Sequence, residues 1–227
     1  MITDAIKRHP DFFRIASALF ISTLVTIGLI VAGSIKSHST YFNFLIYNMM
    51  LAYIPVLLAF WLTLRLKKSA WLSTGNIIIS ILWLSFLPNS FYMITDLIHS
   101  QNAIGIDLLY NIVLIIACIF NSLVAGYISL YLIHWELLKR FYYRKVHLVI
   151  AIILLLCSFA IYLGRFLRWN SWDVVFNPAG LLFDVTDTIA SPSTHPDVFA
   201  TTITFFLLLS SIYVVLWQIT RVLRKTK

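Results

Sequence analysis

Six long apolar segments follow one another along this chain, and they constrain its fold more than any other feature. A helix needs about 20 mostly apolar residues to cross the hydrocarbon core of a bilayer, and each segment is close to or above that length. Their approximate bounds are 15–35, 41–64, 70–94, 106–133, 146–163 and 198–219. We therefore predict an all-α, polytopic integral membrane protein with six transmembrane helices, organised as a single transmembrane domain over residues 1–227.

The composition also favours a membrane protein. Hydrophobic residues make up 60% of the chain and charged residues only 11%, far from the balance of a soluble domain. The net charge of +8 is compatible with a nucleic-acid partner, but the basic residues form small clusters between the apolar segments rather than one basic face. Cys118 and Cys157 lie within apolar segments, so neither a disulfide framework nor a zinc site is indicated. We expect the lipid bilayer as partner, and no nucleic acid.

The distribution of Lys and Arg predicts the orientation of the helices, because basic connections stay on the cytoplasmic side of a membrane. With the N-terminus inside, the outer connections contain only Lys36, Arg165 and Arg168, and all other Lys and Arg residues lie in the inner segments. We therefore expect both termini in the cytoplasm. The first apolar segment is longer than the core of a signal peptide, which has about 7 to 15 residues, so we expect it to be a retained helix.

The connection from Gly164 to Pro196, between the fifth and sixth segments, is long enough to hold a helix. Asn177 and Pro178 have the character of a helix N-cap and a first-turn proline. At helical spacing the residues that follow divide into an apolar face and a polar face: Leu181, Leu182, Val185 and Ile189 against Asp184, Asp187, Thr188 and Ser191. The pattern predicts a short amphipathic helix that either lies on the outer membrane surface or packs on the outer ends of the bundle.

The stretch FLPNSFYMITDLIHS, Phe86 to Ser100, places polar residues at the outer end of the third apolar segment. At about 100° per residue, helical spacing brings four polar side chains into one narrow arc: Asn89, Tyr92, Asp96 and His99. Polar groups that face lipid without partners are costly, so we expect this arc to face the bundle interior or a wet cavity. Pro88 is expected to kink the helix, with Asn89 capping the part that follows.

Other parts of the chain are expected to bring polar groups to the same outer layer. Asp107 and Asn111 share a face at the start of the fourth segment, and Asn43 and Tyr47 do so at the start of the second. The fifth segment ends in YLGRFLRWNSWD, which supplies Arg165, Arg168, Asn170 and Asp173. Several converging ionisable residues at a membrane edge indicate a functional site.

A purely structural explanation of these residues stays open. Arg165 and Arg168 at a helix C-terminus complement the helix dipole and suit an anchor in the lipid headgroups. Asn170 and Asp173 have the spacing of a variant capping box. The outer aspartates would then only neutralise the two arginines in an ion-pair network.

Three segments resemble the signature of a known family: LPNSFYMITDLIH, DLLYN and YLGRFLRWNSWD. They are similar to bacterial multi-pass membrane proteins catalogued as domain of unknown function number thirteen sixty-one, over roughly Ile77 to Pro178. The resemblance implies an integral protein of the bacterial cytoplasmic membrane and brings no established activity. Its characteristic positions correspond to Pro88, Asn89, Tyr92, Thr95, Asp96, His99, Asp107, Arg165, Arg168, Asn170, Trp172 and Asp173.

The chemistry of the polar residues suggests an anionic lipid or cell-envelope precursor as ligand, because two arginines three residues apart suit a phosphate or carboxylate. A histidine beside carboxylates can act as a general acid or base, so the candidate catalytic residues are His99, Asp96 and Asp107. The candidate substrate-binding residues are Arg165, Arg168, Asn89, Tyr92, Asn170 and Asp173. A metal site with a single histidine and scattered aspartates is a weak pattern, so we assign no metal and name no cofactor.

Two other functions stay open: a transporter or channel subunit, and a non-catalytic partner in envelope assembly. A transporter needs polarity through the membrane, but in the fourth segment only Asn121, Ser122 and Ser129 extend polarity inward, and such groups often serve as contacts between helices. The strings H-E-x-x-H and G-x-S-x-G and the phosphate-binding P-loop are missing. The sequence does not decide between these functions or define the oligomeric state.

Overall fold

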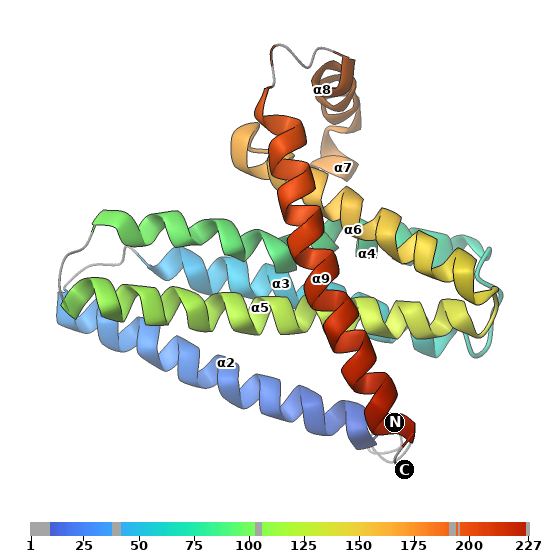
Figure 1. Ribbon diagram of the computed structural model, residues 1–227, viewed down its shortest axis with the longest axis horizontal. Helices are drawn as coiled ribbons and strands as arrows, with labels where there is room; N and C mark the ends of the chain where they lie inside the picture. Colours follow the sequence, from blue (N-terminus) through green and yellow to red (C-terminus); the bar gives the residue numbers. More distant parts are fainter. Residues whose placement is uncertain (1–9, 38–41, 103–105, 191–193, 195, 226–227) are drawn as a thin grey trace.

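The computed structural model describes residues 10–37, 42–102, 106–190, 194 and 196–225. The described residues form helices and connections, with no strand among them. In chain order the elements are α2 (Pro10–Ser37), α3 (Asn43–Arg65), α4 (Thr74–Tyr92), the 3-10 helix η1 (Met93–Asn102), α5 (Ile106–Leu138), α6 (Tyr143–Phe166), α7 (Asp173–Phe176), α8 (Pro178–Ala190) and α9 (Asp197–Lys225) (Figure 1).

Within the described ranges, six helices are long and apolar enough to cross a membrane: α2, α3, α4 with the start of η1, α5, α6 and α9. The all-α, multi-pass prediction is confirmed at this level. Many large apolar side chains on these helices face outward, for example Phe20 at 63% and Leu57 at 68% exposed. Exposure on this scale is typical of a surface that contacts lipid rather than water.

The helices pack around a centre formed by α3, α4 and α5. α3 packs against both α4 and α5, α2 lies along α5, and α9 crosses α6 (Figure 1). α7 and α8 stand to one side of the bundle, beyond the end of α6. One buried apolar cluster joins five helices through Ala59, Leu87, Leu130, Leu154 and Leu209. Lipid is as apolar as these side chains, so their close packing, rather than exclusion of water, holds the helices together.

Buried polar side chains link the helices within the apolar region. Asn121 Nδ2 of α5 donates to Thr26 Oγ1 of α2 at 3.0 Å. Trp83 Nε1 of α4 donates to Ser129 Oγ of α5 at 2.6 Å. These bonds confirm the interpretation of Asn121 and Ser129 as contacts between helices. Ser122 Oγ is also buried but has no hydrogen-bond partner among the described residues.

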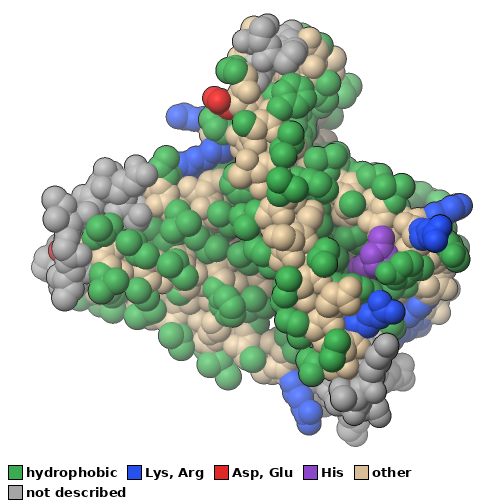
Figure 2. Space-filling view, viewed as in Figure 1, with side chains coloured by type: hydrophobic (Ala, Val, Ile, Leu, Met, Phe, Trp, Pro, Cys, Tyr) green, Lys and Arg blue, Asp and Glu red, His purple; other side chains and the backbone are tan. Residues whose placement is uncertain are grey.

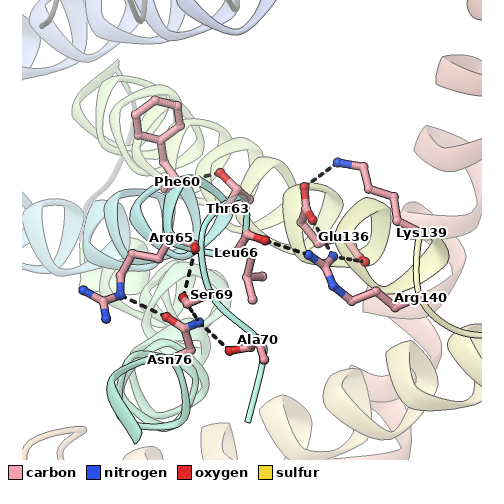
Figure 3. Close-up of polar contacts among 10 residues, drawn as sticks. All are labelled: Phe60, Thr63, Arg65, Leu66, Ser69, Ala70, Asn76, Glu136, Lys139 and Arg140. Carbon is pink, nitrogen blue, oxygen red and sulfur yellow. Dashed lines mark hydrogen bonds and ion pairs between the residues drawn. The ribbon is translucent and has the colours of Figure 1, made fainter. Parts of the chain in front are cut away.

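A second polar network ties the turn between α3 and α4 to the end of α5 (Figure 3). Glu136 is 6% exposed and pairs with Lys139 at 2.5 Å and Arg140 at 2.6 Å. Arg140 also donates to the carbonyl oxygen of Leu66 at 3.1 Å, and its guanidinium lies over the Trp71 ring. The arginine therefore satisfies a terminal carbonyl of α3 while its own charge is balanced by Glu136.

The same turn is closed by the fully buried side chain of Asn76 (Figure 3). Arg65 Nε donates to Asn76 Oδ1 at 2.9 Å. Asn76 Nδ2 donates to Ser69 Oγ and to the Ala70 carbonyl oxygen, each at 2.9 Å. Both the donors and the acceptor of the amide are thus satisfied, which fixes the direction in which α4 leaves the turn.

The ends of α2 and α9 next to the two chain termini lie on the same side of the bundle as the α3–α4 and α5–α6 turns (Figure 1). Lys and Arg side chains gather on this side of the face shown in Figure 2. The alternation of basic and non-basic connections in the sequence is therefore also an alternation between the two ends of the bundle.

The outer end of the third apolar segment differs from its prediction as one continuous α-helix. Pro88 lies inside α4, which continues to Tyr92, and Asn89 does not cap a following helix. From Met93 the chain tightens into η1. A 3-10 helix has three residues per turn, so residues three apart along it share one face. The side chain of His99 lies outside the described residues.

α8 begins as predicted. It starts at Pro178, and Asn177 Oδ1 accepts a hydrogen bond from the Gly180 N–H at 3.2 Å, as an N-cap does. The predicted apolar face has two kinds of surroundings. Leu181 and Val185 pack on the bundle, whereas Leu182 and Ile189 are 66% and 60% exposed. The helix is rotated because residues of the predicted polar face also contact the bundle, as described below.

We expect Glu136→Ala to lower the free energy of unfolding by about 1 to 3 kcal/mol, because it leaves Arg140 without its carboxylate. Lys139→Ala is the matched control. The Lys139 side chain is 49% exposed, and exposed ion pairs contribute about 0 to 1 kcal/mol. Thermal unfolding of the purified variants in detergent measures the loss of stability in each. Equal losses in the two variants would contradict the assignment of Arg140 as the central partner.

Candidate functional site

A cavity of about 490 Å³ lies between α3, α4 and α6, and the chain from Trp169 to Leu181 covers one end of it. Its volume is within the range of small-molecule sites, about 300 to 1,000 Å³. Candidate residues from two different segments of the sequence line this cavity: Asn89, Tyr92, Asp96, Arg165 and Asn170.

Asp96 and Tyr92 reach the cavity from the junction of α4 and η1. Asp96 is in the first turn of η1 and 2% exposed, and Asn48 Nδ2 of α3 donates to its Oδ2 at 3.3 Å. Tyr92 is the last residue of α4, and Thr95 Oγ1 donates to its carbonyl oxygen at 2.8 Å. That bond satisfies a carbonyl at the change of helix type. The side chains of Tyr92 and Asp96 both line the cavity.

The end of α6 brings Arg165 and Asn170 to the same cavity. Arg165 is half-buried in the last turn of α6. The chain then reverses at Arg168, whose φ of 61° is in the left-handed region. The Trp169 N–H donates to the Leu163 carbonyl oxygen at 3.2 Å across this turn. Trp169 and Asn170 are thereby turned back over the cavity instead of continuing along the axis of α6.

Two side-chain hydrogen bonds hold this returning chain in place. Asn89 Nδ2 of α4 donates to Ser171 Oγ at 2.9 Å. Trp169 Nε1 donates to Asp184 Oδ2 of α8 at 2.8 Å. The second bond turns the predicted polar face of α8 towards the bundle, which is why the helix is rotated. The cover of the cavity is therefore fastened to both α4 and α8.

Gly164 permits the close approach of α4 and α6 beside the cavity. A Cβ at this position would lie 3.3 Å from Cε2 of Tyr92 and 3.5 Å from the Trp169 carbonyl oxygen. The first distance is tighter than an ordinary van der Waals contact. A side chain here would push the Tyr92 ring away from α6, so the glycine helps to set the width of the cavity beside Tyr92.

The arginines and the outer aspartates do not form the ion-pair network that the structural explanation requires. In the described part of the chain, neither Arg165 nor Arg168 makes an ion pair, and the pairs found there belong to Glu136. The polar end of the cavity therefore presents a half-buried guanidinium, amide groups and a phenol together with the Asp96 carboxylate. The guanidinium, phenol and amide N–H groups of this set can hold a phosphate or carboxylate through charge-assisted hydrogen bonds, whereas the Asp96 carboxylate accepts a hydrogen bond from Asn48.

The other candidates are not brought into the cavity wall. Arg168 is exposed, so the predicted clamp of two neighbouring arginines is divided. Asp107 is exposed in the first turn of α5. Asp173 Oδ2 accepts a hydrogen bond from the Asn170 N–H at 2.7 Å, a local contact that matches the capping alternative. His99 belongs to η1, and its side chain is outside the described residues.

Sequence reasoning missed Asn48 and Ser171. Asn48 follows Tyr47 inside an apolar span, and an amide in such a segment is itself a signal of a polar site. Tyr47 was predicted to reach the outer polar layer and does line the cavity. Ser171 carries no comparable signal, because its contact with Asn89 depends on the turn at Arg168. Among the described side chains, no group of three or more His, Cys, Asp and Glu residues is arranged to hold a metal ion.

Comparison with known proteins gives a family. The chain matches the family model "Protein of unknown function (DUF1361)" over residues 47–212. This range contains most of α3 and all of α4, α6 and α8, and so nearly the whole cavity wall, whereas α2 lies outside it. No curated protein and no solved structure matches the chain. Because the match extends over more than half of the sequence, the chain belongs to this family of proteins of unknown function.

Proposed function

We propose that this protein lies in the bacterial cytoplasmic membrane as a single transmembrane domain and binds an anionic lipid or other cell-envelope compound in its cavity. The observation that carries the proposal is the position of Arg165 in the cavity wall without an acidic partner among the described residues. A half-buried charge at a membrane edge is costly unless it is paired. A phosphate or carboxylate of the ligand supplies the missing counter-charge.

In this proposal both termini lie in the cytoplasm, and the cavity therefore opens on the outer side of the membrane. This orientation is supported by the position of the basic residues, which gather on the side of the bundle that contains the α3–α4 and α5–α6 turns. The cavity lies towards the opposite end of α3, α4 and α6. In this orientation, helices that span the bilayer carry the cavity towards the headgroup layer of the outer leaflet, which suits a lipid or envelope precursor.

The residues take different roles at this site. Arg165 contacts the anionic group, and Tyr92 and Asn170 donate hydrogen bonds to it. Asn89 is engaged with Ser171, so it holds the cover rather than the ligand. If the bound compound is also transformed, His99 is the proposed general acid or base and Asp96 its proposed partner.

A non-catalytic role in envelope assembly is the second candidate. Phe176, Leu182 and Phe183 are 82%, 66% and 71% exposed around the start of α8. An apolar surface of this kind favours contact with lipid or with another membrane protein. A transporter has less support, because Asn121 and Ser129 are buried in bonds between helices and do not line the cavity.

We expect Arg165→Gln to weaken binding of the anionic lipid at least about tenfold, since a hydrogen bond to a charged group contributes about 1.5 to 3 kcal/mol. Lipids that copurify with the protein, identified by native mass spectrometry, measure the effect. Arg168→Gln is the matched control, because Arg168 is exposed three residues away and should leave the lipid profile unchanged. Identical profiles for wild type and Arg165→Gln would refute the proposal.

The orientation can be tested with single cysteines. Asp107 is exposed in the first turn of α5, and Lys145 is exposed in the first turn of α6, at the opposite end of the bundle. The native Cys118 and Cys157 are both buried. We expect a membrane-impermeant maleimide to label Asp107→Cys in intact cells and Lys145→Cys only after permeabilisation. The reverse pattern would place the cavity on the cytoplasmic side.

A further inference from the structure

The cavity that contains Arg165 continues as an apolar groove towards the middle of the bundle. Its wall beyond the polar end is formed by Leu51 of α3, Leu84 of α4, and Leu156 and Ala160 of α6. On α6 the lining residues extend from Leu156 to Arg165, which are nine residues apart, a distance of about 13 Å along a helix. The groove is therefore elongated along the helices, with a polar end and an apolar end.

The groove is open on the side opposite α4. α4 packs against both α3 and α6, whereas α3 and α6 have little direct contact with each other. No described residue of α2, α5 or α9 lines the cavity. Tyr47 on α3 and Leu156 on α6 line it and are still 53% and 45% exposed. α4 is thus the floor of the groove, and α3 and α6 are its two sides.

The open side faces the region that lipid occupies. α3 and α6 are both candidate membrane spans. Next to the groove, Leu155 on α6 is a 42% exposed apolar residue. The polar end, in contrast, lies under the chain from Trp169 to Leu181, which is fastened by the Asn89–Ser171 and Trp169–Asp184 bonds. A molecule dissolved in the bilayer meets the open side of the groove, and a molecule dissolved in water meets the cover.

We infer that the ligand is a phosphate- or carboxylate-bearing lipid that reaches the cavity sideways from the bilayer, between α3 and α6, and places one hydrocarbon chain in the groove. This inference rests on the proposed function, because Arg165 holds the anionic group. Any further chain of the lipid remains in the bilayer through the open side. A small soluble anion would fill the polar end and leave the apolar end of the groove without a ligand.

The two ends of the groove contribute differently to binding. A hydrocarbon chain gains little by leaving the bilayer, because lipid tails are as apolar as leucine side chains. The anionic group at Arg165 therefore supplies the specific contact, whereas the hydrocarbon chain confines the lipid to the bilayer or micelle beside the groove, where its local concentration is far above that of a soluble anion. The groove also selects by shape which molecules can place the anionic group at Arg165. Filling the groove should exclude the lipid while leaving the polar contacts intact.

The test uses two probes with the same phosphate chemistry: a single-chain lysophosphatidic acid and soluble glycerol phosphate. Binding is measured as thermal stabilisation of the purified full-length protein in a neutral maltoside detergent. We expect lysophosphatidic acid to stabilise the wild type and glycerol phosphate, at the same concentration, to have no effect. Leu156→Trp should weaken binding of lysophosphatidic acid at least about tenfold, equivalent to about 1.4 kcal/mol.

Leu155→Trp is the matched control, because it makes the same substitution on the adjacent outward face of α6, outside the cavity wall. It should bind lysophosphatidic acid as the wild type does. If Leu156→Trp does not yield a monodisperse protein, Ala160→Leu fills the same groove with a smaller change.

The outcomes separate this inference from the function on which it rests. If glycerol phosphate stabilises the wild type as strongly as lysophosphatidic acid, and Arg165→Gln abolishes both effects, the anion site stands and the lipid inference is overturned. Unchanged lysophosphatidic acid binding in both groove-filling variants overturns it as well. If neither probe binds the wild type, or if Arg165→Gln alters neither, the proposed function fails together with it.

Discussion

In the bilayer core a polar group can find a partner only within the protein, and the rest of this structure depends on that constraint. Apolar packing between helices gives little direction in lipid, so bonds such as Asn121 to Thr26 and Trp83 to Ser129 help to determine how the helices face one another. The same constraint explains why polar side chains that the helices do not satisfy lie around a cavity rather than towards lipid. The cavity and the polar contacts between helices are two results of one rule.

The two ends of the bundle deal with buried charge in different ways. At the α3–α4 turn, Arg140 has a carboxylate, a carbonyl oxygen and an aromatic ring as partners, and Glu136 is almost fully buried (Figure 3). That end is a closed structural network. At the other end, Arg165 lies beside a cavity without an acidic partner among the described residues. The contrast within one protein supports our proposal that the second arrangement binds a ligand, whereas the first stabilises the fold.

The sequence was most informative where a property is local. Hydropathy alone located the six apolar helices, and the Asn-Pro pair located the start of α8. It failed at η1, because an apolar-to-polar gradient does not distinguish an α-helix from a 3-10 helix. Asn89, Tyr92 and Asp96 still reach one cavity, since all three lie within three turns of the same helical end. The orientation of the bundle remains a prediction.

The sequence by itself determined which segments are long and apolar enough to span a membrane, and that polar and charged residues lie towards the ends of these segments, because both follow from the cost of placing each local stretch in lipid. Only the tertiary structure decided which polar residues meet. Arg165 and Arg168 are equivalent in a sequence pattern, but the left-handed turn at Arg168 leaves one on the cavity wall and the other exposed. The rotation of α8, the contact of Asn48 with Asp96 and the open side between α3 and α6 likewise depend on how whole helices pack, which no local pattern encodes.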